Sequence, residues 1–223
     1  MKRDFVDFGF VVENKGQTPA WFKQVHGSTA LNLDDATLGS TPAEADAGFT
    51  RIPEKEIYAF TADCLPVLLH GPDTSHPIAA IHAGWRGAMR GVVRQTLAAF
   101  PAPNQVHAIL GPSIGVCCFE IQADFIEAFT QAGRDIRPYL EMRGQKQYCD
   151  LVRFVVEQEL AGVQSVDTSA HRCTVCSTPS LPSYRRNGKA DPMIRSFISF
   201  RKGPVAFRNS EGIPKSDWTL SES

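Results

Sequence analysis

Short apolar segments rich in β-branched and aromatic residues alternate along this chain with segments whose apolar side chains recur every three or four residues. The first pattern is typical of buried strands and the second of amphipathic helices. Strands are expected at 48–51, 57–61, 66–69, 78–82, 106–110 and 197–200. Because helices that alternate with strands pack against the sheet those strands build, the sequence predicts an α/β fold.

Three segments are expected to form the main helices. Residues 87–100 repeat apolar side chains at helical spacing, and Arg86, Arg90 and Arg94 lie on another face of the same helix. Residues 125–132 repeat the apolar pattern. A third helix is expected to begin after Asp150, whose side chain suits an N-cap, and to end near Gly162.

No internal repeat and no long Pro/Gly/Ser linker divides the 223 residues, which suffice for one substantial core. The prediction is a single domain over residues 1–208, α/β and layered in the α+β sense, with a mixed β-sheet flanked by helices. Residues 209–223 are polar and without periodicity, and they are expected to form a loose C-terminal tail.

The charge balance argues against a nucleic-acid partner. The chain has 23 basic and 24 acidic residues and a net charge of -1, so it lacks the excess of Lys and Arg that binds phosphate backbones. Residues 134–223 hold 14 basic and 10 acidic side chains, so an anion pocket is expected to draw on this half. No apolar run approaches the roughly 18 residues of a membrane span, and residues 1–10 lack a signal-peptide core. A cytoplasmic protein without membrane contact is expected.

Six cysteines in a chain of this length are too few for a disulfide scaffold. In a reducing compartment, a patterned cysteine suggests a metal ligand or a nucleophile. The residues to weigh in this way are Cys64, Cys117, Cys118, Cys149, Cys173 and Cys176.

Three phrases each place one metal-ligating side chain where an expected strand meets a Gly- or Pro-bearing turn: QVHGS at 24–28, TADCLP at 61–66 and IHAGWRG at 81–87. Their ligands are His26, Cys64 and His82. The separations are too long for a zinc finger, so a shared site would have to be assembled by the fold. Three N/S ligands with a fourth position open to water are how catalytic zinc is held. Taken singly, each residue is as well explained by an ordinary hydrogen-bonded histidine or a buried cysteine.

Six phrases occur in the order QVHGS, ADAGFT (45–50), TADCLPVLL (61–69), IHAGWRG, GPSIGVCCFE (111–120) and SYRRNG (183–188). As an ordered set, spanning about 21–201, they resemble the YfiH/LACC family. Members of that family have been called polyphenol oxidases or multicopper laccases, and also purine nucleoside phosphorylases with adenosine deaminase activity. The resemblance implies a YfiH/CNF1-like fold.

The resemblance also implies that His26, Cys64 and His82 bind the metal, with Zn²⁺ as the expected ion and Cu²⁺ as the alternative. The expected function is a zinc-dependent purine nucleoside phosphorylase with adenosine deaminase activity, whose partners are a purine nucleoside and phosphate. One alternative is a copper-dependent polyphenol oxidase. However, this chain has six histidines and no His-x-His pair, fewer than a trinuclear copper cluster uses. Copper at the three-ligand site would then be the simplest source of phenol oxidation.

Four further residues receive expected roles. Asp63 adjoins Cys64 and is expected to carry a proton during deamination, or else to orient a ligand histidine by accepting its ring N–H. Arg86, at the start of an expected helix, is expected to hold phosphate, and Arg185 and Arg186 are expected to contribute from the more basic half. The alternative for these arginines is a solvated face or salt bridges.

Other readings of the same residues remain open. GPSIG matches the G-x-S-x-G nucleophile elbow, and Ser113, Asp150 and His171 occur in the order of an α/β-hydrolase triad. The apolar residues that follow argue instead for a structural turn. Cys64 with His82 as its base would give a metal-free hydrolase acting on peptides. A binding module that has lost turnover is a further alternative.

Two cysteine pairs have no assigned role. Cys173 and Cys176 form a single C-x-x-C, which is half of a zinc ribbon, and two reduced thiols in a loop are the expected state. Cys117 and Cys118 are adjacent and would point to opposite faces of a strand.

Overall fold

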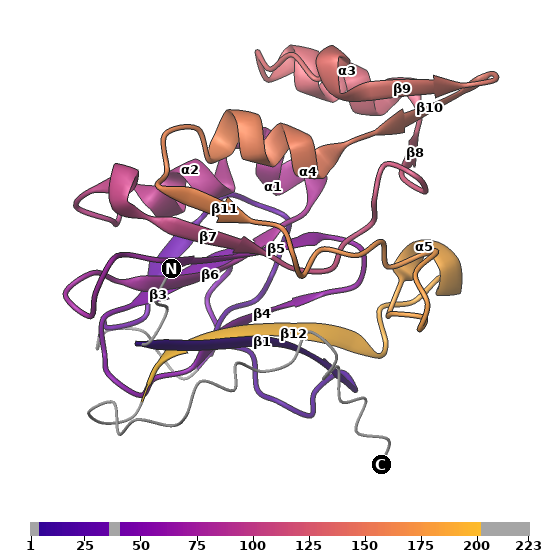
Figure 1. Cartoon of the computed structure of the whole chain (residues 1–223). Coiled ribbons are helices and arrows are strands. Elements are labelled where there is room, and N and C mark those ends of the chain that lie inside the picture. The colour runs from indigo at the N-terminus through magenta and orange to yellow at the C-terminus, as the bar shows by residue number, and fades with distance from the viewer. Residues whose placement is uncertain (1–4, 36–40, 202–223) are drawn as a thin grey trace.

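The computed structural model describes residues 5–35 and 41–201, so the expected tail at 209–223 lies outside the described residues. A six-stranded mixed sheet in the order β11-β7-β5-β6-β3-β2 forms the middle layer (Figure 1). The β11–β7 and β2–β3 pairs are parallel, and the other pairs are antiparallel. Its strands are β2 (Ala30–Asn32), β3 (Ala47–Thr50), β5 (Leu65–His70), β6 (Ile78–Ala83), β7 (His107–Leu110) and β11 (Ser165–Asp167).

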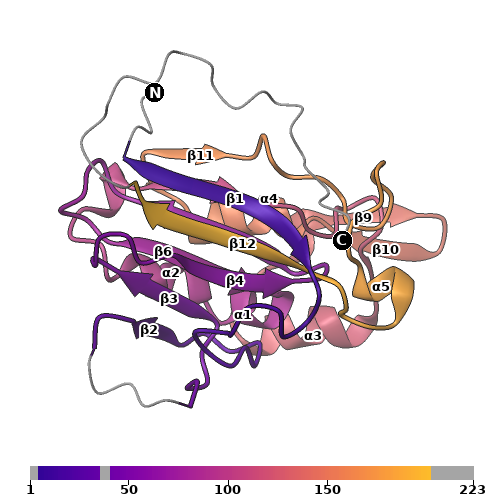
Figure 2. The ribbon, with the colours of Figure 1, turned by 90° about the horizontal axis from the view of Figure 1, so that it is seen from below.

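Helices cover one face of this sheet, and a second sheet covers the other (Figures 1 and 2). The second sheet is antiparallel in the order β1-β12-β4. Its strands are β1 (Val6–Glu13), β4 (Ile57–Thr61) and β12 (Met193–Phe200). The helices are α1 (Trp85–Met89), α2 (Val92–Leu97), α3 (Ala123–Gln131), α4 (Leu151–Phe154) and α5 (Tyr184–Asn187).

Shorter elements complete the chain. A small antiparallel sheet lies beside α3 in the order β8-β10-β9 (Figure 1). It is built from β8 (Glu120–Ile121), β9 (Leu140–Arg143) and β10 (Lys146–Cys149). The 3₁₀ turns are η1 (Pro103–Gln105) and η2 (Arg137–Tyr139), and a π-helical turn, η3 (Val155–Glu159), continues α4. No helix in the described ranges is long and apolar enough to cross a membrane.

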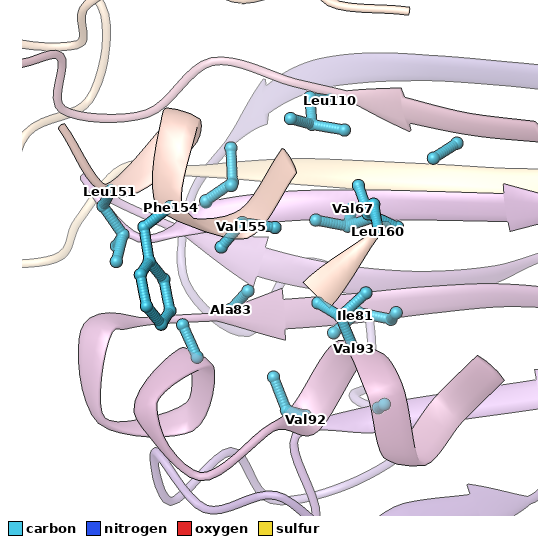
Figure 3. Close-up of a cluster of buried hydrophobic side chains, with 14 of the residues drawn as sticks. Val67, Ile81, Ala83, Val92, Val93, Leu110, Leu151, Phe154, Val155 and Leu160 are labelled. Carbon is cyan, nitrogen blue, oxygen red and sulfur yellow. The ribbon is translucent and has the colours of Figure 1, made fainter. Parts of the chain in front are cut away.

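The middle sheet is buried on both faces, which explains its continuous apolar runs. In β5, Val67 points to the helix side and Leu68 to the second sheet, and both are fully buried. Figure 3 shows the helix-side cluster, in which Val93 of α2 lies beside Ile81 and Phe154 of α4 lies nearer to Ala83. The predicted mixed sheet with helices is confirmed, with the added finding that a second sheet replaces helices on one face.

All six predicted strands are present, but the single helix predicted over 87–100 is wrong. The chain forms two short helices there, because Gly91 adopts φ 80°, a left-handed conformation that interrupts α1 before α2 begins. The helix predicted after Asp150 is confirmed, and the Asp150 side chain accepts the Arg153 N–H at 2.9 Å as its N-cap.

Candidate functional site

Two loops and the end of strand β6 meet at one end of the middle sheet, where His26 and Cys64 from the loops lie beside His82 of β6. Their ligand atoms all lie within 4.8 Å of one another. The Cys64 Sγ is 3.8 Å from the His26 Nε2, and the two imidazole rings meet edge to face with centroids 4.8 Å apart. The structure therefore assembles the three residues that the sequence places 38 and 18 positions apart.

The carboxylate of Asp46 organises this cluster. It is fully buried just before β3, and its Oδ1 accepts the His82 ring Nδ1–H at 2.7 Å. The same carboxylate accepts backbone N–H bonds from Val25 at 3.3 Å, His26 at 2.9 Å and Gly27 at 2.6 Å. One buried anion thus orients one histidine through its ring and the other through its backbone, and the His82 Nε2 remains free to bind a metal.

The QVHG loop is held on both sides. The Gln24 side chain donates to the Phe60 carbonyl at 2.7 Å and accepts the Phe60 N–H at 2.8 Å, which fixes the loop to β4. His26 itself has φ 58°, and its carbonyl accepts a bond from the Arg90 guanidinium at 3.2 Å. These contacts stabilise a left-handed conformation that a non-glycine residue rarely adopts.

Glycine is required where the loops approach most closely. A Cβ on Gly84 would lie 2.9 Å from the Cys64 Sγ and 3.0 Å from the His26 Cδ2. A Cβ on Gly87 would lie 2.8 Å from the Gly27 carbonyl oxygen. The glycines of the HAGWRG phrase therefore make room for the ligand cluster.

The electrostatics of the site favour the ionised forms of Cys64 and His82. Burial raises the pKa of the Cys64 thiol, but the charge of His82 and hydrogen bonds from His26 and His82 outweigh it and lower this pKa to about 6. Burial lowers the pKa of His82, but the Cys64 charge and the hydrogen bond to Asp46 raise it to about 9. Without metal, the pair is a thiolate beside an imidazolium at neutral pH, so the sulfur is already in the state that binds a cation, whereas His82 would release its Nε2 proton when a metal binds.

The donor set fits a metal ion of the zinc or copper type. Zinc bonds of about 2.3 Å to sulfur and about 2.0 Å to nitrogen would place neighbouring ligand atoms about 3.5 Å apart, close to the observed S···N distance. A thiolate with two imidazoles is a soft to borderline set, which suits Zn²⁺ or copper and does not suit Mg²⁺ or Ca²⁺.

These three side chains line a pocket of about 930 Å³. Its walls are largely apolar and aromatic, and residues 14–20 after β1 close one side. The basic residues Lys15, Lys23, Arg86 and Arg185 also line the pocket. Aromatic residues on the wall include Phe22, Phe60, Phe119 and Tyr184.

Asp63 lines the pocket beside Cys64 with φ 94°, and both of its carboxylate oxygens are engaged. Oδ1 accepts the Thr174 hydroxyl at 2.5 Å, and Oδ2 accepts the Arg185 backbone N–H at 2.6 Å. The sequence-based alternative was that Asp63 orients a ligand histidine. This assignment is wrong, because Asp46 and not Asp63 makes that contact with His82. Sequence reasoning did not single out Asp46, although an acidic residue within the apolar ADAGF run was a usable signal.

The predicted anion-binding arginines separate into different environments. Arg86 is exposed in the pocket with its guanidinium 4.1 Å from the Trp85 ring centroid, and within the described ranges its side chain makes no hydrogen bond or ion pair. Its helix has only five residues, so the predicted anion site rests on the guanidinium and not on the helix N-terminus. Arg94, which was not assigned to the anion site, pairs with buried Glu159 at 3.0 Å.

Arg185 also lines the pocket, but its guanidinium donates to the carbonyls of Cys118 at 3.4 Å and Glu120 at 3.1 Å. The Arg186 guanidinium donates to the carbonyls of Thr174 and Val175, both at 3.0 Å, and it does not line the pocket. Arg186 therefore holds the loop before α5, and its geometry does not support the predicted phosphate contact.

The structure contains one contact that the serine-hydrolase alternative requires, but it lacks the surroundings that such a catalytic triad needs. Ser113 Oγ lies 3.0 Å from His171 Nε2, but Ser113 is only 2% exposed and neither residue lines the pocket. The Asp150 carboxylate caps α4, and β7 is followed by a turn leading to the short strand β8, where an elbow requires a helix. GPSIG is therefore a structural turn.

Comparison with known proteins places this arrangement in a family. Residues 10–200 match the family described as multi-copper polyphenol oxidoreductase laccase. A protein of Shigella flexneri named purine nucleoside phosphorylase YfiH is 35% identical over 192 residues, covering 85% of this chain and 76% of that protein. A purine nucleoside phosphorylase of Aquifex aeolicus is 35% identical over 178 residues, covering 78% of this chain and 80% of that protein.

A crystal structure of a Neisseria meningitidis protein matches with a TM-score of 0.69 and 33% identity, covering 81% of this chain and 74% of that one. The resemblance drawn from the six phrases is confirmed. The chain belongs to the multi-copper polyphenol oxidoreductase laccase family, in the branch that includes YfiH.

Proposed function

We propose that this protein is a zinc-dependent purine nucleoside phosphorylase that also deaminates adenosine. The observation that carries the proposal is one pocket that joins the His26, Cys64 and His82 donor set to the guanidinium of Arg86, which has no ion-pair partner among the described residues. Phosphorolysis needs a bound anion, and deamination needs activated water. The names of relatives at 35% identity support the first activity.

In phosphorolysis, a phosphate oxygen forms a bond to C1′ of the ribose as the bond from C1′ to the purine nitrogen breaks. The guanidinium of Arg86 neutralises the phosphate and orients it through two parallel N–H donors. The apolar and aromatic lining accepts the purine ring and excludes water from the reacting centre. The Arg185 guanidinium already donates to two backbone carbonyls, so it contributes positive charge to the pocket wall more than a direct bond to phosphate.

Zinc bound by the three ligands supplies Lewis-acid polarisation and activation of water. The chain's own residues prepare for it. Asp46 holds the Nδ1–H of His82, so that the Nε2 lone pair points to the cluster, and Cys64 enters as a thiolate. Asp63 acts as a positioning residue, because its two oxygens tie the Cys64 turn to Thr174 and to the backbone of Arg185.

The test is an incubation of the metal-analysed protein with adenosine and with inosine, with and without phosphate. Phosphorolysis gives ribose 1-phosphate and free base only when phosphate is present, whereas deamination converts adenosine to inosine without it. Cys64→Ser is expected to lose the zinc of the His26, Cys64 and His82 cluster and both activities, because a hydroxyl is a far poorer soft ligand. Cys149→Ser, which removes a buried thiol outside the pocket, is the matched control. No turnover of either nucleoside by zinc-loaded protein would refute the proposal.

The family description favours a second activity, oxidation of phenols with copper at the same three ligands. Cu²⁺ binds N/S sites more tightly than Zn²⁺, so copper loading would give this activity without further sites. The cluster offers two imidazoles, and no other histidine within residues 5–35 and 41–201 lines the pocket. Phenol oxidation that follows copper content, and that zinc suppresses, would identify this activity as a consequence of the bound metal.

A metal-free hydrolase is favoured by a different observation, the relay from Cys64 through His82 to Asp46. This is the order of nucleophile, base and orienting carboxylate. Metal analysis separates the hydrolase from the zinc enzyme. A metal-free protein that cleaves peptides until its Cys64 is alkylated would replace the zinc proposal.

A further inference from the structure

Four of the remaining cysteines gather at a second place. The Sγ atoms of Cys117, Cys118, Cys173 and Cys176 all lie within 4.8 Å of one another, and those of Cys117 and Cys176 are 3.4 Å apart. Cys117 and Cys118 would point to opposite faces if they lay on a strand, but no strand forms here. They lie in a turn, closed by the Cys118 N–H donating to the Gly115 carbonyl at 2.9 Å, so both thiols reach the cluster.

The backbone brings the two pairs together. Ser113 and Cys173 form a parallel bridge, in which the Ser113 N–H donates to the Arg172 carbonyl at 3.2 Å and the Thr174 N–H donates to the Ser113 carbonyl at 3.0 Å. The Ser177 N–H donates to the Cys173 carbonyl at 3.1 Å, which closes a turn around the C-x-x-C pair. The cluster therefore rests on backbone pairing and not on the chance meeting of flexible side chains.

Backbone amides point at one of the sulfurs. The Gly115 N–H donates to the Cys173 Sγ at 3.4 Å. The backbone amides of Val175 and Cys176 also donate hydrogen bonds to this sulfur. Amides that surround a sulfur stabilise a thiolate ligand.

We propose that these four cysteines bind a second metal ion, a structural zinc held by four thiolates. Tetrahedral zinc with bonds of about 2.3 Å to sulfur places neighbouring sulfurs about 3.8 Å apart, within the spread of this cluster. Each thiol proton leaves to solvent as the Zn–S bond forms. A site filled by four protein ligands has no open position, so it stabilises the fold and does not take part in the reaction.

The contacts of this cluster show what it would stabilise. Thr174, between the two cysteines of the C-x-x-C pair, donates its hydroxyl to Asp63 at 2.5 Å. Arg185 donates both to the Cys118 carbonyl and, through its backbone, to Asp63. The proposed second zinc thus holds the loop that fixes the turn before Cys64, a ligand of the first site.

Metal stoichiometry tests the proposal independently of any nucleoside chemistry. Protein purified anaerobically with a phosphine reductant should contain two equivalents of zinc. Cys176→Ser should retain one, and the His26→Ala/His82→Ala double variant should also retain one. Cys149→Ser, a buried cysteine outside both clusters, should retain two. Because a serine variant can fail to fold, the double histidine variant is also loaded with Co²⁺, where four thiolates give strong sulfur-to-cobalt charge-transfer absorption.

Two results would overturn the proposal. One is a single equivalent of zinc in the wild-type protein that disappears entirely in the double histidine variant, with no charge-transfer band after addition of Co²⁺. The other is a disulfide between Cys117 and Cys176 in the reduced, anaerobic preparation, detected by mass spectrometry after the free thiols are blocked.

Discussion

Asp46→Asn tests the organisation of the site with the smallest change in shape. In the native site, Oδ1 accepts N–H bonds from His26 at 2.9 Å and His82 at 2.7 Å, while Oδ2 accepts those of Gly27 at 2.6 Å and Val25 at 3.3 Å. An asparagine amide has only one acceptor oxygen. Whichever way it turns, its NH₂ group faces two N–H donors that have lost their acceptor.

The magnitude follows from that count. A buried donor left without a partner costs about 1–3 kcal/mol, so two of them should lower the free energy of unfolding by about 2–6 kcal/mol. The effect on metal binding is separate. Loss of the carboxylate that orients a ligand histidine typically weakens metal affinity by about 10–100-fold. Both effects are expected, because Asp46 supports His82 through its ring and the QVHG loop through its backbone.

The assay pairs a zinc competition titration against a chromophoric chelator with urea unfolding of the metal-free protein. The control is Asp34→Asn, which removes another carboxylate that accepts two hydrogen bonds, from the Thr50 hydroxyl and from the Arg51 N–H at 2.8 Å, away from the pocket. This control should lose stability and keep zinc affinity at the first site. If Asp46→Asn binds zinc within about twofold of the native protein, the carboxylate does not orient the ligands and the reasoning is refuted.

Three further substitutions probe the neighbouring contacts. Gly84→Ala should displace the cluster of His26, Cys64 and His82 and reduce zinc content, since its Cβ would lie 2.9 Å from the Cys64 sulfur. Gly133→Ala strains the backbone, because Gly133 has φ 68°, but its Cβ would meet no described atom within 4 Å, so zinc content should stay unchanged. Arg86→Ala should raise the KM for phosphate at least about tenfold, the effect of losing one charge-assisted hydrogen bond, while adenosine deamination and zinc content stay near native values; an equal loss of both activities would mark a structural role. Asp63→Asn and Thr174→Val should reduce deamination to a similar degree if Asp63 is a positioning residue, and a much larger loss in Asp63→Asn alone would identify it as the proton carrier.

The sequence predicted the middle of the molecule better than its edges. The runs that became β5 and β6 are apolar along their whole length because both faces of the middle sheet are buried, so they were readable as strands. β1 was missed because Val6–Glu13 mixes two charged residues and Gly9 with its apolar side chains at an outer strand of the second sheet. The break at Gly91 was missed because the apolar spacing continues across it, although the backbone does not.

The candidate ligands His26, Cys64 and His82 were predictable because each lies in its own recognisable phrase at a turn or strand end, while their supports were not. Asp46 acts through hydrogen bonds to residues 20 and 36 positions away, and no local spacing encodes such contacts. Local spacing does not encode the four-cysteine cluster either. Its two pairs are 59 residues apart, measured from Cys117 to Cys176, and only the parallel bridge at Ser113 brings them together.

The geometry of the first site is strained before any metal binds, and the strain identifies what holds it. His26 and Asp63 are two of the three non-glycine residues with positive φ in the described part of the chain, a conformation that costs of order 1–3 kcal/mol each. His26 keeps it because its N–H and its carbonyl are bound by Asp46 and Arg90. Asp63 keeps it because its side chain is tied to Thr174 and Arg185. The ligand geometry is therefore imposed by charge-assisted hydrogen bonds within the protein, so metal affinity at this site should depend on those bonds as much as on the ligands themselves.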